Sequence, residues 1–176
     1  MYSTVLHLLV RHFFIAMKIE NCCLIGHSLI KHLEVYDRLK NAIEQFIIGG
    51  CKHFIVGQHG EFDEYAKSCL LDLKIKYPDI RIEIVMRSPR YMGAPKNSDP
   101  ELFYPDMLKE PFDYLMYNIE DVYYKARIDF CNKRMIDDCD AVICYIDKTQ
   151  IHSGAKRAYN YARRQNKYIY NILQAR

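Results

Sequence analysis

The stretch HFIVGQHGEFDEYA, residues 53–66, decides the fold. It contains an apolar run that ends at Gly57, a turn with a second glycine at Gly60, and an acidic segment with helical spacing from Glu61 onward. A buried strand that feeds a helix through a tight turn leaves backbone N–H groups unpaired at its carboxyl end, where an anionic or nucleotide-like ligand can bind. The stretch therefore predicts a strand, a helix and a ligand site between them.

Similar apolar runs recur about 30 residues apart, which is the length of a strand and its crossover helix. They begin near Asn21, Lys52, Ile80, Asp113, Asp140 and Lys167. The pattern also predicts helices over residues 34–48, ending at Gly49-Gly50, and over 61–77, ending before Pro78, because the residue before a proline resists the helical conformation. We therefore predict an α/β fold: a three-layer, Rossmann-like domain with a mainly parallel sheet of about five to six strands and helices on both faces.

Residues 87–110 interrupt this alternation. Five of the six prolines lie in or next to this segment, so we predict a long loop over the edge of the sheet, with a short helix near residues 105–109. Loops of this length are usually functional or disordered. Arg87, Arg90 and Tyr91 could close over a ligand.

The amino-terminal residues 1–16 also form an apolar run. This run has no basic leading region, contains Arg11 and His12, and is too short to span a bilayer comfortably, so we expect neither a signal peptide nor a membrane helix. We predict an extension over residues 1–19 and a single domain over residues 20–176. The alternative is that the run packs as an edge element of the core.

Composition narrows the class of protein. A chain of 176 residues with 50% apolar residues can bury one sizeable core. A net charge of +3 is too small to favour nucleic acid as a partner. The seven cysteines show no CxxC pairing, so we expect reduced core thiols in a cytoplasmic protein, with neither a disulfide framework nor a zinc site.

Ligands of open parallel sheets bind over the carboxyl ends of the strands, where the strand order reverses. Residues expected at such ends are His27, Ser28, Gly57 to Glu61, Ser153 and Gly154. Backbone amides at Gly57, Gly60, Ser153 and Gly154 could bind a phosphate, and Ser28 and Ser153 could add hydroxyl groups. The alternative is that these glycines only form tight turns.

Two cations give an independent indication of an anionic ligand. Lys156 and Arg157 fall in the first turn of the last predicted helix, where each opposes the helix dipole by about 0.3–1 kcal/mol. A bound anion would reverse this penalty. Alternatively, both side chains extend into solvent, where the penalty is small.

Carboxylates gather at the start of the helix predicted over residues 61–77. Glu61, Asp63 and Glu64 are favoured there by the helix dipole alone. Asp63 could also accept hydrogen bonds from ribose hydroxyls. If the protein cleaves a glycosidic bond, a carboxylate must stabilise the oxocarbenium-like transition state, and Glu61 and Asp63 are the candidate catalytic residues.

Three histidines are expected near the same rim: His27, His59 and His152. Their spacing along the chain is not that of metal ligands, so we predict no metal site. We expect them to bond to a ligand or to loop carbonyl groups.

Five short motifs between Glu20 and Leu173 occur in the order seen in a known family. They are Gly26-His27, the segment from Gly57 to Asp63, Leu73-Lys74 with Tyr77 to Ile80, the segment from Asn132 to Asp137, and Ser153-Gly154-Ala155. Together they resemble the SLOG superfamily, the Rossmann-like group that includes the cytokinin-activating phosphoribohydrolases and DprA. Within that group, the chain is most similar to the YpsA-like branch.

The resemblance implies a cytosolic sensor or regulatory homodimer that binds a nucleotide, a nucleotide-sugar or an NAD-derived metabolite and requires no cofactor. The implied ligand-binding residues are Gly26, His27, Ser28, Gly57, Gln58, His59, Gly60, Asp63, Asn132, Arg134, Ser153, Gly154 and Ala155. The chain has Cys131 where the family has arginine, and its last helix lacks the glutamate of the phosphoribohydrolases. Alternatives are a hydrolase of N-glycosidic or phosphoribosyl bonds and a protein-interaction regulator linked to cell division.

Overall fold

The computed structural model describes residues 18–86, 111–119, 121–147, 149–150 and 153–174. The predicted loop over residues 87–110, with its short helix, lies outside the described residues. So do His152 and nearly all of the predicted amino-terminal extension.

Six strands form one sheet. They are β1 (Asn21–Gly26), β2 (His53–Val56), β3 (Arg81–Met86), β4 (Asp113–Met116), β5 (Ala141–Tyr145) and β6 (Tyr168–Asn171). The order across the sheet is β4-β3-β2-β1-β5-β6, and every neighbouring pair is parallel. The predicted α/β fold is confirmed, and the sheet has six strands.

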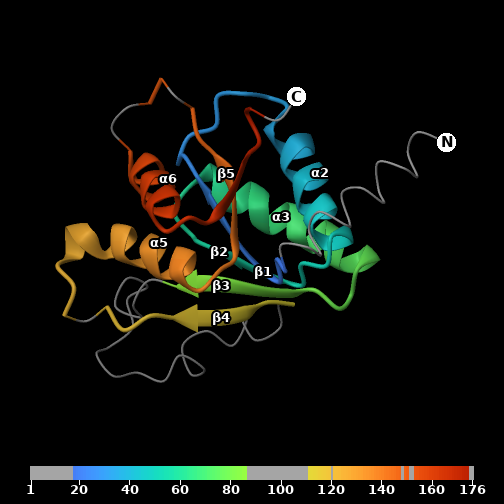
Figure 1. Ribbon diagram of the computed structural model, residues 1–176, viewed down its shortest axis with the longest axis horizontal. Helices are drawn as coiled ribbons and strands as arrows, with labels where there is room; N and C mark the ends of the chain where they lie inside the picture. Colours follow the sequence, from blue (N-terminus) through green and yellow to red (C-terminus); the bar gives the residue numbers. More distant parts are fainter. Residues whose placement is uncertain (1–17, 87–110, 120, 148, 151–152, 175–176) are drawn as a thin grey trace.

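Helices cover both faces of this sheet (Figure 1). They are α2 (Val35–Ile48), α3 (Glu61–Lys76), α5 (Arg127–Asp137) and α6 (Gly154–Arg164), with a short 3-10 helix, η3 (Tyr124–Ala126), before α5. The side chain of Leu24 packs in the core with α2 and α3, whereas its neighbours Cys23 and Ile25 pack in the core with α5 and α6. Because both faces are buried, β1 is a continuous apolar run, as expected of a central parallel strand.

The helix ends follow the sequence signals. Helix α2 ends at Ile48 with Gly49 as its C-cap, and Gly50 has a φ of 110°, a left-handed conformation that glycine adopts without steric cost. Helix α3 ends at Lys76, one residue earlier than predicted, and Tyr77 precedes Pro78. Within the described residues, no helix is both long and apolar enough to cross a bilayer.

The strand order reverses at β1. From this central strand the chain moves outward through β2, β3 and β4, and then returns to place β5 and β6 on the opposite side of β1. The carboxyl ends of β1 and β5 therefore flank the crevice in which open α/β sheets bind ligands.

Candidate functional site

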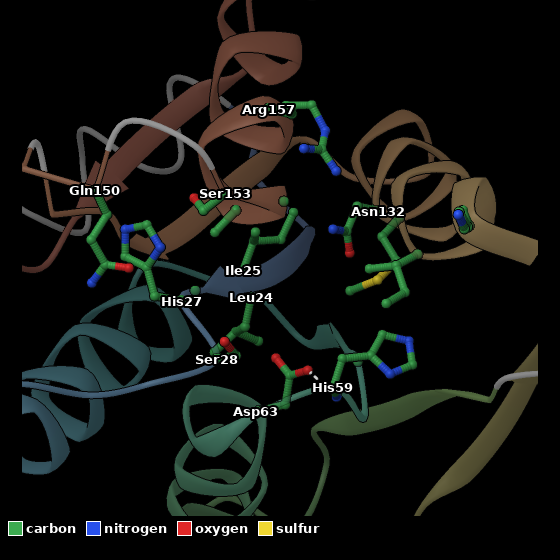
Figure 2. A pocket seen from close by; sticks show the side chains of 18 residues that line it. Leu24, Ile25, His27, Ser28, His59, Asp63, Asn132, Gln150, Ser153 and Arg157 are labelled. Atoms are coloured by element: carbon green, nitrogen blue, oxygen red, sulfur yellow. Dashed lines mark hydrogen bonds between the residues drawn. The ribbon is translucent and has the colours of Figure 1, made fainter.

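A cavity of about 250 Å³ lies over the carboxyl ends of β1, β2 and β5 (Figure 2). Its wall includes residues 24–28 at the end of β1, part of the β2–α3 turn, the amino end of α6, and side chains from η3 and α5. Segments far apart in the sequence therefore meet at the point where the strand order reverses.

Asp63 holds the β2–α3 turn closed. Its carboxylate oxygen Oδ2 accepts the backbone N–H of His59 at 2.6 Å, and the side chain is only 9% exposed. A Cβ atom at Gly57 would lie 2.9 Å from the same oxygen, so a larger residue there would displace the Asp63 carboxylate. Asp63 acts much as the third-position acid of a capping box, which bonds back to the turn before its helix.

Two hydrogen bonds of Glu61 connect the start of α3 to the segment that follows β1. The N–H of Glu61 donates to the carbonyl of Ser28 at 3.0 Å, and the carboxylate of Glu61 accepts the N–H of Ile30 at 2.7 Å. A Cβ atom at Gly60 would lie 2.4 Å from the Cα of Ser28. The amino end of α3 is therefore bonded within the protein, and Glu61 does not line the cavity formed by the described residues.

The amino end of α6 differs from that of α3. Ser153 is its N-cap, and its hydroxyl oxygen accepts the N–H of Lys156 at 3.0 Å. The amides of Gly154 and Ala155 have no partner within the helix, because the first amides of any helix lack one, and both residues line the cavity. Because Ser153, Gly154 and Ala155 line the cavity, the positive end of the helix borders it, and none of the described first-turn residues is an acid that would offset this charge.

The two predicted first-turn cations have partners. The Arg157 Nε atom donates to Asp129 of α5 at 3.1 Å, and the Lys156 ammonium lies 5.4 Å from the centre of the Tyr159 ring. Arg157 also lines the cavity. The charge of Arg157 is thus held at the cavity rim, close to the end of the helix.

His27 is buried at the end of β1, with 2% of its surface exposed. Its Nε2 atom accepts the N–H of Asp147 at 3.0 Å, so the ring links β1 to the segment after β5. Burial lowers the pKa of His27 below its ordinary value and outweighs the contact with Asp147 and its charge, which raise the pKa. The imidazole is therefore neutral at physiological pH.

The remaining part of the cavity wall comes from η3 and α5. It is formed by Lys125, Ile128, Asn132 and Met135. Sequence reasoning identified only Asn132. Ile128, Asn132 and Met135 are spaced i, i+4 and i+7, so they share one helix face. Helical periodicity applied to Asn132 would have found the other two residues.

Two predicted ligand-binding residues do not line this cavity. Gln58 borders a separate hollow beside Phe112 and Tyr114. The guanidinium of Arg134 lies 5.7 Å from the centre of the Tyr117 ring, because a position two residues beyond Asn132 faces a different side of the helix. The other predicted ligand-binding residues all line the cavity.

The described residues contain no group of three or more His, Cys, Asp or Glu side chains that could hold a metal ion. All seven cysteines are buried and unbridged, and burial raises the pKa of Cys51 to about 12. The described residues that line the cavity offer hydrogen-bond donors, two cations (Lys125 and Arg157), the carboxylate of Asp63 and an apolar wall.

The chain was compared with known proteins by sequence. A scan against protein-family models finds none that matches, and a search of the curated proteins finds no match. Function is therefore inferred from the geometry of the cavity.

Proposed function

We propose that this chain binds a nucleotide or nucleotide-derived small molecule in the cavity and acts as a sensor or regulatory domain. One observation carries the proposal: the amino end of α6, capped by Ser153 and with no acid among its described first-turn residues, faces the cavity at the reversal of strand order. This arrangement favours an anionic group such as phosphate.

The other walls suit the remaining parts of a nucleotide. The Asp63 carboxylate accepts the His59 N–H, and because a carboxylate can accept several hydrogen bonds, it can also accept from ribose hydroxyls. Ile128, Met135 and Asn132 offer apolar surface and an amide to a base. The volume of about 250 Å³ is near the lower end for ligand pockets, which favours a mononucleotide-sized ligand. The same ligand class is the one that the sequence resemblance to the SLOG superfamily implies.

A hydrolase is favoured less. Glycoside hydrolases commonly divide acid and nucleophile roles between two carboxylates. Asp63 is the one carboxylate among the described residues that line the cavity, and the carboxylate of Glu61 is bonded to Ile30. Binding without turnover is therefore the better explanation of the site.

The test is thermal unfolding of the protein with a panel of ribonucleoside 5′-monophosphates, nucleotide-sugars, ADP-ribose and NAD. A ligand that binds only the folded state raises the unfolding temperature. A Cβ atom at Gly154 meets only a terminal nitrogen of Arg157, at 3.9 Å, so Gly154→Val should fold yet place a branched side chain against the bound phosphate. Gly154→Ala is the graded control.

We expect at least one panel member to stabilise the wild type, Gly154→Ala to respond less, and Gly154→Val not to respond. Equal stabilisation of Gly154→Val and wild type would remove α6 from the site. No response of the wild type to any member would overturn the proposed function.

A further inference from the structure

Two buried side-chain donors border the cavity without an acceptor. The Nδ1 atom of His27 and the Nε2 atom of Gln150 have no hydrogen-bond partner in the part of the chain that the structure describes. Both residues line the cavity, and they come from opposite sides of the strand reversal. Buried polar groups are nearly always paired, so two such donors at one cavity indicate a group that binds there.

The proton on the His27 ring can be assigned from its contacts. Nε2 accepts the backbone N–H of Asp147, and a nitrogen that accepts carries no proton, so in the neutral ring the proton is on Nδ1. The carboxylate oxygen Oδ1 of Asp147 accepts from the backbone and the hydroxyl of Thr149. Nδ1–H is therefore a donor fixed by a long-range backbone contact.

Other donors occupy the same corner. The Ser153 oxygen accepts from Lys156, which leaves its hydroxyl proton to donate, and the first amides of α6 add N–H groups. Figure 2 shows the side chains of His27, Gln150 and Ser153 together on one side of the cavity. Five donors therefore meet here: His27 Nδ1, Gln150 Nε2, Ser153 Oγ and the Gly154 and Ala155 amides. They outnumber the roughly four lone-pair sites on the two oxygens of a carboxylate. A phosphate monoester has three strong acceptor oxygens, each with more than one lone pair, and can accept from all five.

We propose that His27 and Gln150 are specificity-determining residues that recognise the terminal phosphate of a 5′-phosphorylated nucleotide seated at the amino end of α6. This inference rests on the proposed function and adds the chemical class of the group that is recognised. Both side chains are neutral donors, so they select an acceptor-only group by hydrogen bonding.

A matched pair of substitutions separates recognition from structure. In His27→Asn the side-chain amide nitrogen can take the place of Nδ1, but nothing replaces Nε2 as acceptor for Asp147. In His27→Gln the side-chain oxygen can reach the Nε2 position and accept from Asp147, but the donor at Nδ1 is lost. Gln150→Met removes the second donor at similar size.

Calorimetry should compare the four ribonucleosides, their 5′-monophosphates and inorganic phosphate on each variant. Wild type should bind at least one monophosphate tenfold or more tightly than its nucleoside. His27→Gln and Gln150→Met should each lose about 10- to 100-fold in monophosphate affinity, the range for a hydrogen bond to a charged group, with nucleoside affinity unchanged. His27→Asn should keep most of the monophosphate affinity while unfolding at a lower temperature.

The possible failures differ. If nucleosides and monophosphates bind wild type equally, the inference is overturned and the proposed function stands. The inference is also overturned if His27→Asn loses affinity and His27→Gln keeps it, because that order is the one expected of a purely structural residue. If only inorganic phosphate binds, and His27→Gln abolishes it, the phosphate subsite stands and the nucleotide proposal fails. If no probe binds, both are overturned.

Discussion

Replacing Asp63 with asparagine tests the role that the structure gives to the best acidic candidate. The Asp63 carboxylate accepts the N–H of His59 at 2.6 Å and is almost fully buried. A hydrogen bond to a charged group stabilises by about 1.5–3 kcal/mol and a neutral one by about 0.5–1.5 kcal/mol. An acid in the first turn of a helix adds about 0.3–1 kcal/mol. Asp63→Asn should therefore lower the free energy of unfolding by about 2 kcal/mol.

Glu64→Gln is the matched control, because it removes a carboxylate from the same helical turn. Glu64 is largely exposed and pairs with Lys67 three residues later, so Glu64→Gln loses the same favourable interaction with the helix dipole and a weak ion pair, about 1 kcal/mol in all. The assay is urea unfolding followed by circular dichroism. If Asp63→Asn loses no more stability than Glu64→Gln, the carboxylate does not hold the β2–α3 turn and this reasoning fails.

The same variant also tests ligand recognition. Asp63→Asn should weaken nucleotide binding by about 1–3 kcal/mol, the scale of one charge-assisted hydrogen bond, and the wild type should release no free base. Release of base or ribose 5-phosphate by wild type, at a rate that collapses in Asp63→Asn while the nucleotide still binds, would replace the sensor with a hydrolase.

Three further predictions follow from single features. Gly57→Ala should lower the unfolding temperature, because its Cβ atom would lie 2.9 Å from the Asp63 carboxylate; an unchanged temperature would mean that the turn can relax. Because burial lowers the folded-state pKa of His27, its contribution to stability should be fully present above the unfolded pKa of about 6.5 and lost as pH falls through the folded pKa. A pH series should show this loss in wild type and not in His27→Gln, where protonation cannot break the bond to Asp147; identical profiles would count against it. A chain that starts at Met17 should fold, since the described core begins at Ile19 and the first strand at Asn21; loss of the circular dichroism spectrum would show that the preceding run belongs to the core.

The two helix ends at the cavity explain where an anion is expected. The amino end of α3 begins with Glu61, Asp63 and Glu64, and its turn is closed by bonds to the chain itself. Among the described residues, the first turn of α6 has a serine cap, two cations and no acid. A bound phosphate would be repelled by the first and attracted by the second. The cavity is thus polarised from α3 to α6.

The fold could be predicted from the sequence because each strand is a short apolar run bounded by turn signals. Residues 53–56 and the turn that follows them illustrate this, since one stretch specifies strand, turn and helix. The parallel arrangement followed from the spacing of the runs, which leaves room for a crossover helix between most of them. Local pattern was sufficient for these features.

The details of the site were harder to predict, because they depend on contacts between distant residues. The Nε2 atom of His27 meets the N–H of Asp147, 120 positions away, and only the pairing of β1 with β5 brings them together. Likewise, the carboxylate of Glu61, a predicted catalytic residue, accepts the N–H of Ile30 in the loop after β1. Arg134 was grouped with Asn132 by motif, although the helix directs them to different sides.

The most direct test of the central claim is a nuclear magnetic resonance titration of ¹⁵N-labelled protein with the four ribonucleoside 5′-monophosphates. We expect saturable shifts of the Gly154 and Ala155 amides and of the His27 ring nitrogens, and no shift at Leu71, which lines a separate hollow. Saturable shifts confined to another part of the chain, or none at any concentration, would contradict a nucleotide site at the amino end of α6.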